Sequence, residues 1–268
     1  MKRFQRIFLF MGLMLADFMA LAVFLSLNPG IAAFLSLNSF LLLSITEIIF
    51  IFPALPLYLL ITRQKLRDVL PLKPLGWKNV AYLTFMSFLL EPATSLLSAL
   101  TSLFYDNAAM EITSMFTIEN LPAALLALAV LPSLVEEICF RGAVLNASKG
   151  MSVMNAVIIN GLLFGLIHMN PQQIPYAFFL GVIFSLYVIH TQSIYSSILA
   201  HFLVNAPNVL IALLLPDNVE PALSVEEALP SLGLLAVIAV LFFIGFLSVY
   251  RRFRLYNLYR NPIEKITG

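Results

Sequence analysis

Long apolar runs, interrupted only by short polar segments, are the feature that most constrains the fold of this chain. Hydrophobic residues make up 61% of its 268 residues, whereas only 11% are charged. A soluble domain carries about 25% charged residues, so this chain has too few to cover a water-exposed surface. About twenty apolar residues in a helix cross a bilayer. The sequence therefore predicts an all-α polytopic membrane protein, with residues 1–268 forming a single membrane domain.

Run length and flanking charge predict a helical bundle of about eight transmembrane helices. The expected spans are 7–27, 40–61, 80–104, 122–145, 153–168, 174–189, 194–215 and 232–250. The single cysteine, Cys139, excludes an internal disulfide framework. The formal net charge of +1 provides no basic surface for nucleic acid, so no nucleic-acid partner is expected.

Lysine and arginine gather at the N-terminus, between the second and third spans, and in the C-terminal tail up to Lys265. With eight spans these three segments fall on one side of the membrane. The acidic loops, with Glu119 in one and Asp217 and Glu220 in the other, fall on the opposite side. Cytoplasmic loops carry an excess of Lys and Arg. We therefore expect an integral membrane protein with both termini cytoplasmic, located in the cell membrane if the source is bacterial.

The expected span 122–145 carries Glu136, Glu137 and Arg141, although residues 121–135 contain no charge. Charges inside bilayer hydrocarbon are costly unless they are paired or face a wet cavity. Glu137 and Arg141 are four residues apart with the acid first, the favourable order for an ion pair on one helical face. Glu136 lies about 100° round the helix and lacks such a partner. We interpret Glu136 as the functional carboxylate, with Glu137 and Arg141 supporting it.

Two of the three histidines also lie within expected spans. Phe164 and His168 share one face of the fifth span, and His201 and Asn205 share one face of the seventh. Counted from the nearest turns, Glu136, His201 and Asn205 lie about 21, 14 and 20 Å from the cytoplasmic end. The same count puts His168 at about 27 Å, which is too deep to meet the other three without tilt or a long connection.

Three motifs result: EE-x-x-x-R at 136–141, F-x-x-x-H at 164–168 and H-x-x-x-N at 201–205. Together they resemble the CAAX-protease and bacteriocin-processing family, also called CPBP or Abi. Its members are intramembrane endopeptidases related to the prenyl-protein CAAX protease. The resemblance covers 121–215, which we expect to be a core of four helices, whereas 1–120 and 216–268 are expected to be variable flanking helices.

The resemblance implies roles for the motif residues. Glu136 would activate a water molecule, His168 would help to hold it, and His201 and Asn205 would stabilise the oxyanion. Glu136, His168 and His201 would also form a His₂Glu set suited to zinc, and the family is often labelled a metalloprotease for that reason. The chain has no local HExxH motif, and Asn205 resembles an oxyanion donor. We therefore favour a mechanism without metal or other cofactor, with zinc as the alternative.

Two other classes of function stay open. Asp17, Glu47 and Glu91 also lie within spans and have no role in the family, which would suit a secondary transporter. The chain could also be a catalytically silent membrane scaffold. No inverted repeat is visible and no motif residue is missing, so we favour an intramembrane endopeptidase. Its expected partners are membrane lipid and a protein or peptide substrate, with a prenylated tail and a bacteriocin-type precursor as the candidates.

Overall fold

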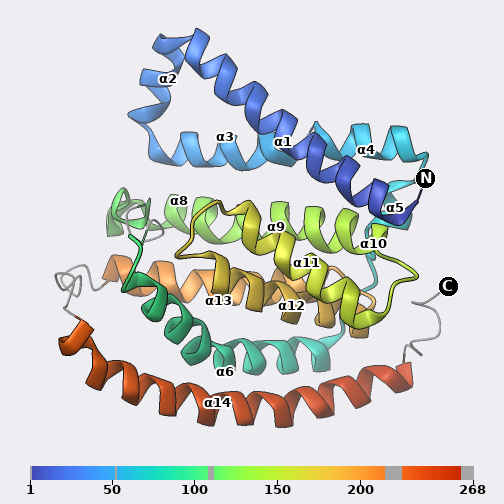
Figure 1. Cartoon of the computed structure of the whole chain (residues 1–268), viewed down its shortest axis with the longest axis vertical. Coiled ribbons are helices and arrows are strands. Elements are labelled where there is room, and N and C mark those ends of the chain that lie inside the picture. The colour runs from blue at the N-terminus through green and yellow to red at the C-terminus, as the bar shows by residue number, and fades with distance from the viewer. Residues whose placement is uncertain (1, 52, 108–111, 215–224, 261–268) are drawn as a thin grey trace.

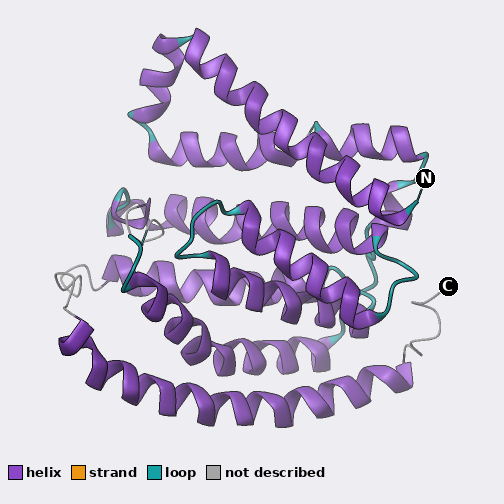
Figure 2. Cartoon of the chain, in the orientation of Figure 1, coloured by secondary structure: helices purple, strands orange, loops and turns teal. Residues whose placement is uncertain are grey.

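The computed structural model describes residues 2–51, 53–107, 112–214 and 225–260. Among these residues it contains helices and connecting loops but no strand (Figure 2). An isolated bridge between Leu72 and Ser193 is the one β-type pairing in the described chain. The predicted all-α class is therefore confirmed. Asp217, Glu220 and Lys265, which entered the predicted topology, lie outside the described residues.

The helices lie side by side in one bundle (Figure 1). In chain order they are α1 (Arg3–Leu27), α2 (Pro29–Ser36), α3 (Ser39–Ile51), α4 (Ala54–Thr62), α5 (Leu66–Val69), α6 (Trp77–Ser102), η1 (Ile118–Asn120), α8 (Leu121–Leu125), η2 (Leu126–Val130), α9 (Leu131–Glu137), η3 (Ile138–Val144), α10 (Leu145–Ala147), α11 (Val153–Ile167), α12 (Ile174–Thr191), α13 (Tyr195–Leu214) and α14 (Val225–Arg260). Helices α1–α4 cover one side of the bundle, α6 and α14 cover the other, and α8–α13 lie between them (Figure 1).

Seven of the described helical stretches are long and apolar enough to cross a membrane. The fifth expected span, 153–168, is the helix α11, which has only 15 residues. At 1.5 Å per residue it is about 22 Å long, shorter than the roughly 30 Å hydrocarbon core. The fold is thus the expected helical membrane bundle, with one expected span formed by a shorter apolar helix.

The stretch from Ile118 to Ala147 is not a regular α-helix. Two π-helical turns, η2 and η3, flank the short α-helix α9 that carries the two glutamates. Pro132 lies in the first turn of α9 and has no N–H, so the carbonyl of Leu128 lacks the donor that a continuous α-helix would provide. Helical irregularities of this kind free backbone groups for other partners and often occur at functional sites.

Helices α11 and α12 approach each other closely because small residues face one another. A Cβ atom added at Gly181 of α12 would lie 2.7 Å from Cα of Gly161 on α11. A Cβ at Gly161 would in turn meet the carbonyl oxygen of Phe178 at 2.9 Å. Membrane helices pack through small residues because lipid supplies no hydrophobic drive between helices. This packing brings the face of α11 that carries Phe164 against α12.

Basic residues from distant parts of the chain meet at one end of the bundle. Arg3 donates to the carbonyl of Gly150 at 2.7 Å, and Lys149 Nζ lies 3.4 Å from the carbonyl of Asp68. Helix α14 ends at the same side of the bundle as α1 begins (Figure 1). The basic segments therefore share one end, as the predicted topology requires. The assignment of that end to the cytoplasm stays a prediction.

Candidate active site

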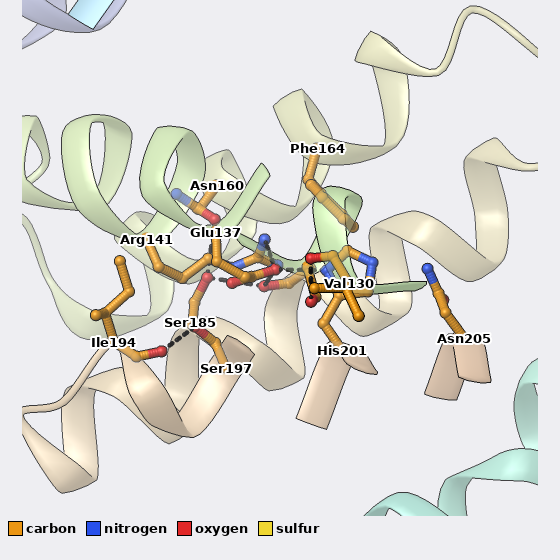
Figure 3. A network of polar contacts seen from close by, with 12 residues as sticks. Val130, Glu137, Arg141, Asn160, Phe164, Ser185, Ile194, Ser197, His201 and Asn205 are labelled. Atoms are coloured by element: carbon orange, nitrogen blue, oxygen red, sulfur yellow. Dashed lines mark hydrogen bonds and ion pairs between the residues drawn. The ribbon is translucent and has the colours of Figure 1, made fainter. Parts of the chain in front are cut away.

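Glu137 is the centre of a buried polar network formed by four helices (Figure 3). Its side chain has no exposed surface, and its Oε1 accepts from Nη1 of Arg141 at 2.9 Å. The predicted pair four residues apart is therefore confirmed. The same Oε1 lies 2.9 Å from Nδ1 of His201 on α13, a contact that the sequence analysis did not anticipate. Glu137 thus links the first motif to the third.

Arg141 is buried in the π-helical turn η3 and is held on several sides. Its Nη2 donates to the carbonyl of Gly181 at 3.2 Å. Its guanidinium carbon lies 4.3 Å from the ring centre of Phe164 and 5.4 Å from that of Phe184. A desolvated guanidinium is stabilised by both a carboxylate and aromatic faces. The arginine therefore joins η3, α11 and α12 and compensates the charge of Glu137.

The hydrogen bond to Glu137 fixes the ring of His201. A carboxylate oxygen can only accept, so Nδ1 of His201 carries the proton in this contact. The other ring nitrogen, Nε2, is then turned away from Glu137. A carboxylate partner of this kind orients an imidazole and stabilises positive charge on the ring when Nε2 takes up a proton. The arrangement prepares His201 to act on a neighbouring group through Nε2.

Phe164 lies between the two histidines that the sequence singled out. Its ring centre is 5.2 Å from that of His168 and 5.9 Å from that of His201, both in edge-to-face geometry. Nδ1 of His168 lies 2.8 Å from the carbonyl of Phe164. Because a carbonyl only accepts, Nδ1 carries the proton and Nε2 is directed elsewhere. The second and third motifs therefore meet around the ring of Phe164.

Glu136 differs from Glu137 in its surroundings. It is partly exposed, whereas Glu137 is fully buried, and it makes no ion pair like that of Glu137 with Arg141; Oε2 of each glutamate is buried without a hydrogen-bond partner among the described residues. It lies close enough to interact electrostatically with Glu47 of α3 and Tyr176 of α12. The prediction that Glu136 lacks a partner in its own helix agrees with this arrangement. Glu47, to which the family resemblance gave no role, comes from the N-terminal helices to face the proposed site.

Asn205 lies one turn beyond His201 on α13. Its Nδ2 donates to the carbonyl of Leu128 at 3.2 Å. This is the carbonyl that Pro132 leaves without its α-helical donor. The side chain of Asn205 supplies a donor to it instead. An amide group has two N–H donors, and this contact uses one of them. The other is available to an oxygen in the site.

A second buried layer supports the network from behind. Asn160 of α11 donates from Nδ2 to the carbonyl of Phe140 at 2.6 Å. Its Oδ1 accepts from Oγ of Ser185 on α12 at 2.9 Å. These bonds tie the π-helical turn η3 to α11 and α12 and so hold Arg141 in place. The sequence offers no signal for Ser185, because it is a lone serine in an apolar helix.

The predicted zinc alternative requires Glu136, His168 and His201 to converge. Within the described part of the chain, no three His, Cys, Asp or Glu side chains gather closely enough to hold a metal ion. The carboxylate that contacts His201 is Glu137, and its Oε1 is occupied by the His201 ring and by Arg141. The donor arrangement described here does not fit a His₂Glu zinc site.

A shallow apolar groove runs along the seam between α13 and the helix that carries the glutamates. Its volume is about 400 Å³, and its lining includes Ser133 and Leu134 on one side and Ile198 and Phe202 on the other. These residues lie within about one turn of Glu137 or His201 along their helices. The groove therefore lies along the same two helices that the Glu137–His201 hydrogen bond joins.

Comparison with known proteins gives independent information on this segment. Residues 118–207 match the family described as type II CAAX prenyl endopeptidase Rce1-like. The chain is also 32% identical over 110 residues to the membrane-embedded CAAX protease MroQ of Staphylococcus aureus (strain USA300). That alignment covers 38% of this chain and 44% of the relative, so it spans less than half of either protein. No solved structure matches the chain.

The family match covers the helices that bring the three motifs together around Glu137, Phe164 and His201. The resemblance inferred from those motifs is confirmed. Residues 118–207 of this membrane protein are thus similar to the type II CAAX prenyl endopeptidase Rce1-like family.

Proposed function

We propose that this protein is an intramembrane endopeptidase that hydrolyses a peptide bond of a membrane-associated protein or peptide. The observation that carries the proposal is the contact of Glu137 with His201 at 2.9 Å, next in the chain to Glu136, whose Oε2 has no hydrogen-bond partner among the described residues. Three motifs that are far apart in the sequence thus converge on one buried centre. The similarity of residues 118–207 to a protease family supports the same conclusion.

In the proposed reaction Glu136 is the general base. It takes a proton from a water molecule held between its carboxylate and Nε2 of His168, and the water oxygen forms a bond to the carbonyl carbon of the substrate. The carbonyl π electrons move to the oxygen, where the free N–H of Asn205 and a protonated Nε2 of His201 stabilise the negative charge. The C–N bond then breaks, and Glu136 returns the proton to the leaving amine. No metal or other cofactor takes part.

Glu137 and Arg141 have a supporting role in this scheme. Arg141 compensates the buried charge of Glu137, and Glu137 orients His201 and stabilises positive charge on its ring. Phe164 separates the two histidine rings and covers the guanidinium. Residues 121–215 are proposed as the catalytic core, and the helices on either side as variable flanking parts.

The substrate is proposed to reach the centre through the apolar groove between α9 and α13. Its lining suits apolar side chains or a hydrocarbon chain, and the groove follows the seam that holds His201. The relative's designation as a CAAX protease makes a prenylated tail one candidate, and a bacteriocin-type precursor is the other. We propose that the basic end of the bundle, with both chain termini, faces the cytoplasm.

The function is tested with purified protein in proteoliposomes and fluorogenic peptides carrying apolar or prenylated tails. Wild-type protein is expected to cleave at least one peptide. Glu136→Gln is expected to fold normally and to lose cleavage, because Gln cannot accept the proton from water. Full activity in folded Glu136→Gln contradicts the assignment of the base. Solute uptake without peptide cleavage would identify a transporter instead.

A further inference from the structure

The turn that follows His168 is fastened to the end of α6 by one buried side chain, Gln172. The side chain of Gln172 is fully buried, and its Nε2 lies 2.8 Å from Oγ of Ser98 and 3.2 Å from Oγ of Ser102. The same nitrogen lies 3.3 Å from the carbonyl of Ser98. The backbone carbonyl of Gln172 accepts from Oγ1 of Thr101 at 2.9 Å. Three polar residues in the last turns of α6, Ser98, Thr101 and Ser102, thus hold one glutamine.

The amide of Gln172 is attached through its nitrogen alone. Its Oε1 is buried without a hydrogen-bond partner in the part of the chain that the structure describes. An amide nitrogen has two N–H donors, and three acceptors on α6 lie within reach of them. The contact therefore depends on the hydroxyl groups and the carbonyl at the end of α6.

The backbone between His168 and Gln172 has little freedom. His168 ends α11, and its N–H bonds back to the carbonyl of Gly165 at 3.3 Å. Met169 has a φ of 49°, a left-handed conformation that is uncommon for a residue with a side chain. Oδ1 of Asn170 accepts from the backbone N–H of Gln172 at 2.9 Å. A displacement of Gln172 is therefore transmitted to His168 through a short, constrained turn.

We propose that Gln172 is a positioning residue that couples the end of α6 to the ring of His168. Helix α6 lies outside the segment 118–207 that matches the protease family, so a flanking helix would set the geometry of the proposed site. The inference rests on the proposed role of His168 in holding the water. Misplacement of a reacting group by about 1 Å can cost about 10²-fold in rate. A loose turn would therefore lower turnover without weakening the binding of substrate.

The first test measures the ring of His168 directly and needs no enzymatic activity. The full chain contains three histidines, so ¹⁵N NMR of ring-labelled protein in bilayers gives few signals. Those of His168 are identified by their loss in His168→Gln. Gln172→Ala is expected to shift the His168 signals and to leave those of His201 unchanged. Unchanged His168 signals in folded Gln172→Ala overturn the proposal, whether or not the protein cleaves peptides.

Gln64→Ala is the matched control. Nε2 of Gln64 also donates to a side chain of another helix, Oδ1 of Asn146 at 3.1 Å, but at the other end of the bundle (Figure 1). This variant is expected to leave the His168 signals and turnover unchanged. Equal shifts of the His168 signals in Gln64→Ala and Gln172→Ala would overturn the proposal, because the effect would then be general.

The second test is kinetic. Gln172→Ala is expected to lower kcat about 10- to 100-fold with KM unchanged. The double variant Ser98→Ala/Ser102→Ala removes the two hydroxyl acceptors of the Gln172 amide and is expected to lower kcat as well, which keeps the proposal testable if Gln172→Ala fails to fold. Ser98→Thr retains the hydroxyl and is expected to retain kcat. Wild-type kcat and wild-type His168 signals in the double variant would overturn the proposal.

Discussion

Nδ1 of His201 lies 2.9 Å from Oε1 of Glu137, a residue 64 positions earlier in the chain. The same oxygen accepts from Arg141 at 2.9 Å, so one carboxylate serves a helical neighbour and a distant histidine together. Glu137 therefore has two separable functions: it balances the charge of a buried guanidinium and it orients the His201 ring. The proposed division of labour, with Glu136 as base and Glu137 as support, follows from this arrangement.

Glu137→Gln is expected to lower stability, because it leaves the guanidinium of Arg141 buried without its counter-charge. Breaking one side of a buried ion pair costs about 3–5 kcal/mol. Replacing both partners, as in Glu137→Gln/Arg141→Met, is expected to recover part of the lost stability but not cleavage, because His201 still lacks its carboxylate. Thermal unfolding and peptide cleavage of the two variants check this. A single variant as stable as the wild type would show that the pair is not energetically coupled.

Asn205→Ala is expected to lower kcat about 10²- to 10³-fold, which corresponds to about 2.7–4 kcal/mol for one oxyanion donor. Asn208→Ala is the control, since Asn208 lies one turn further along α13 and its Nδ2 donates to the carbonyl of Val204 at 2.7 Å. Steady-state cleavage by the two variants is compared under conditions where both are folded. Equal losses at 205 and 208 would argue against a role for Asn205 at the oxyanion.

Purified protein is expected to contain no stoichiometric metal and to keep its activity after treatment with a chelator. The reason is that, in the part of the chain that the structure describes, no three His, Cys, Asp or Glu side chains gather closely enough to hold a metal ion. Elemental analysis and cleavage assays with and without chelator check this. One zinc per chain, lost together with activity in His168→Ala and His201→Ala, would establish the zinc alternative and leave Asn205 a minor role.

The proposed orientation is tested with single cysteines in a chain whose Cys139 has been replaced. Glu119 and Lys149 are both exposed; Glu119 lies at the beginning of the spanning stretch Ile118–Ala147, and Lys149 lies just beyond its end. Lys149→Cys is expected to react with a membrane-impermeant thiol reagent from the cytoplasmic side only, and Glu119→Cys from the opposite side only. The reverse labelling pattern would invert the proposed topology.

Gly181→Ala is expected to lower stability by about 1–3 kcal/mol, because the added Cβ overpacks the contact of α12 with α11. The atom it would meet, Cα of Gly161 at 2.7 Å, belongs to the backbone and cannot rotate away. Gly233→Ala in α14 is the matched control, since an added Cβ there meets nothing within 4 Å. Thermal unfolding of both variants checks the difference. Equal stability of the two would contradict the close approach of α11 and α12.

The segment that carries the proposed chemistry could be predicted from the sequence. Charged residues inside apolar runs are rare because each is costly in lipid, so Glu136, Glu137 and Arg141 stood out against their surroundings. The pair of Glu137 with Arg141 was predictable as well, because helical geometry places residues four apart on one face. The all-α class followed from composition, since lipid leaves backbone groups no partners but each other.

Contacts between helices could not be predicted in the same way. The depth count assumed a regular rise of 1.5 Å per residue, and this cannot hold across the π-helical turns η2 and η3. Three contacts of the site depend on how α9, α11, α12 and α13 pack. They are the hydrogen bond of His201 with Glu137, the position of Phe164 between two histidines, and the hydrogen bond of Ser185 with Asn160. The sequence by itself determined which charged residues are unfavourable in the membrane, because the free energy of burying a charge depends on the residue and on its neighbours in the same helix. Only the tertiary structure decided which distant side chains compensate them, because helix packing sets those contacts.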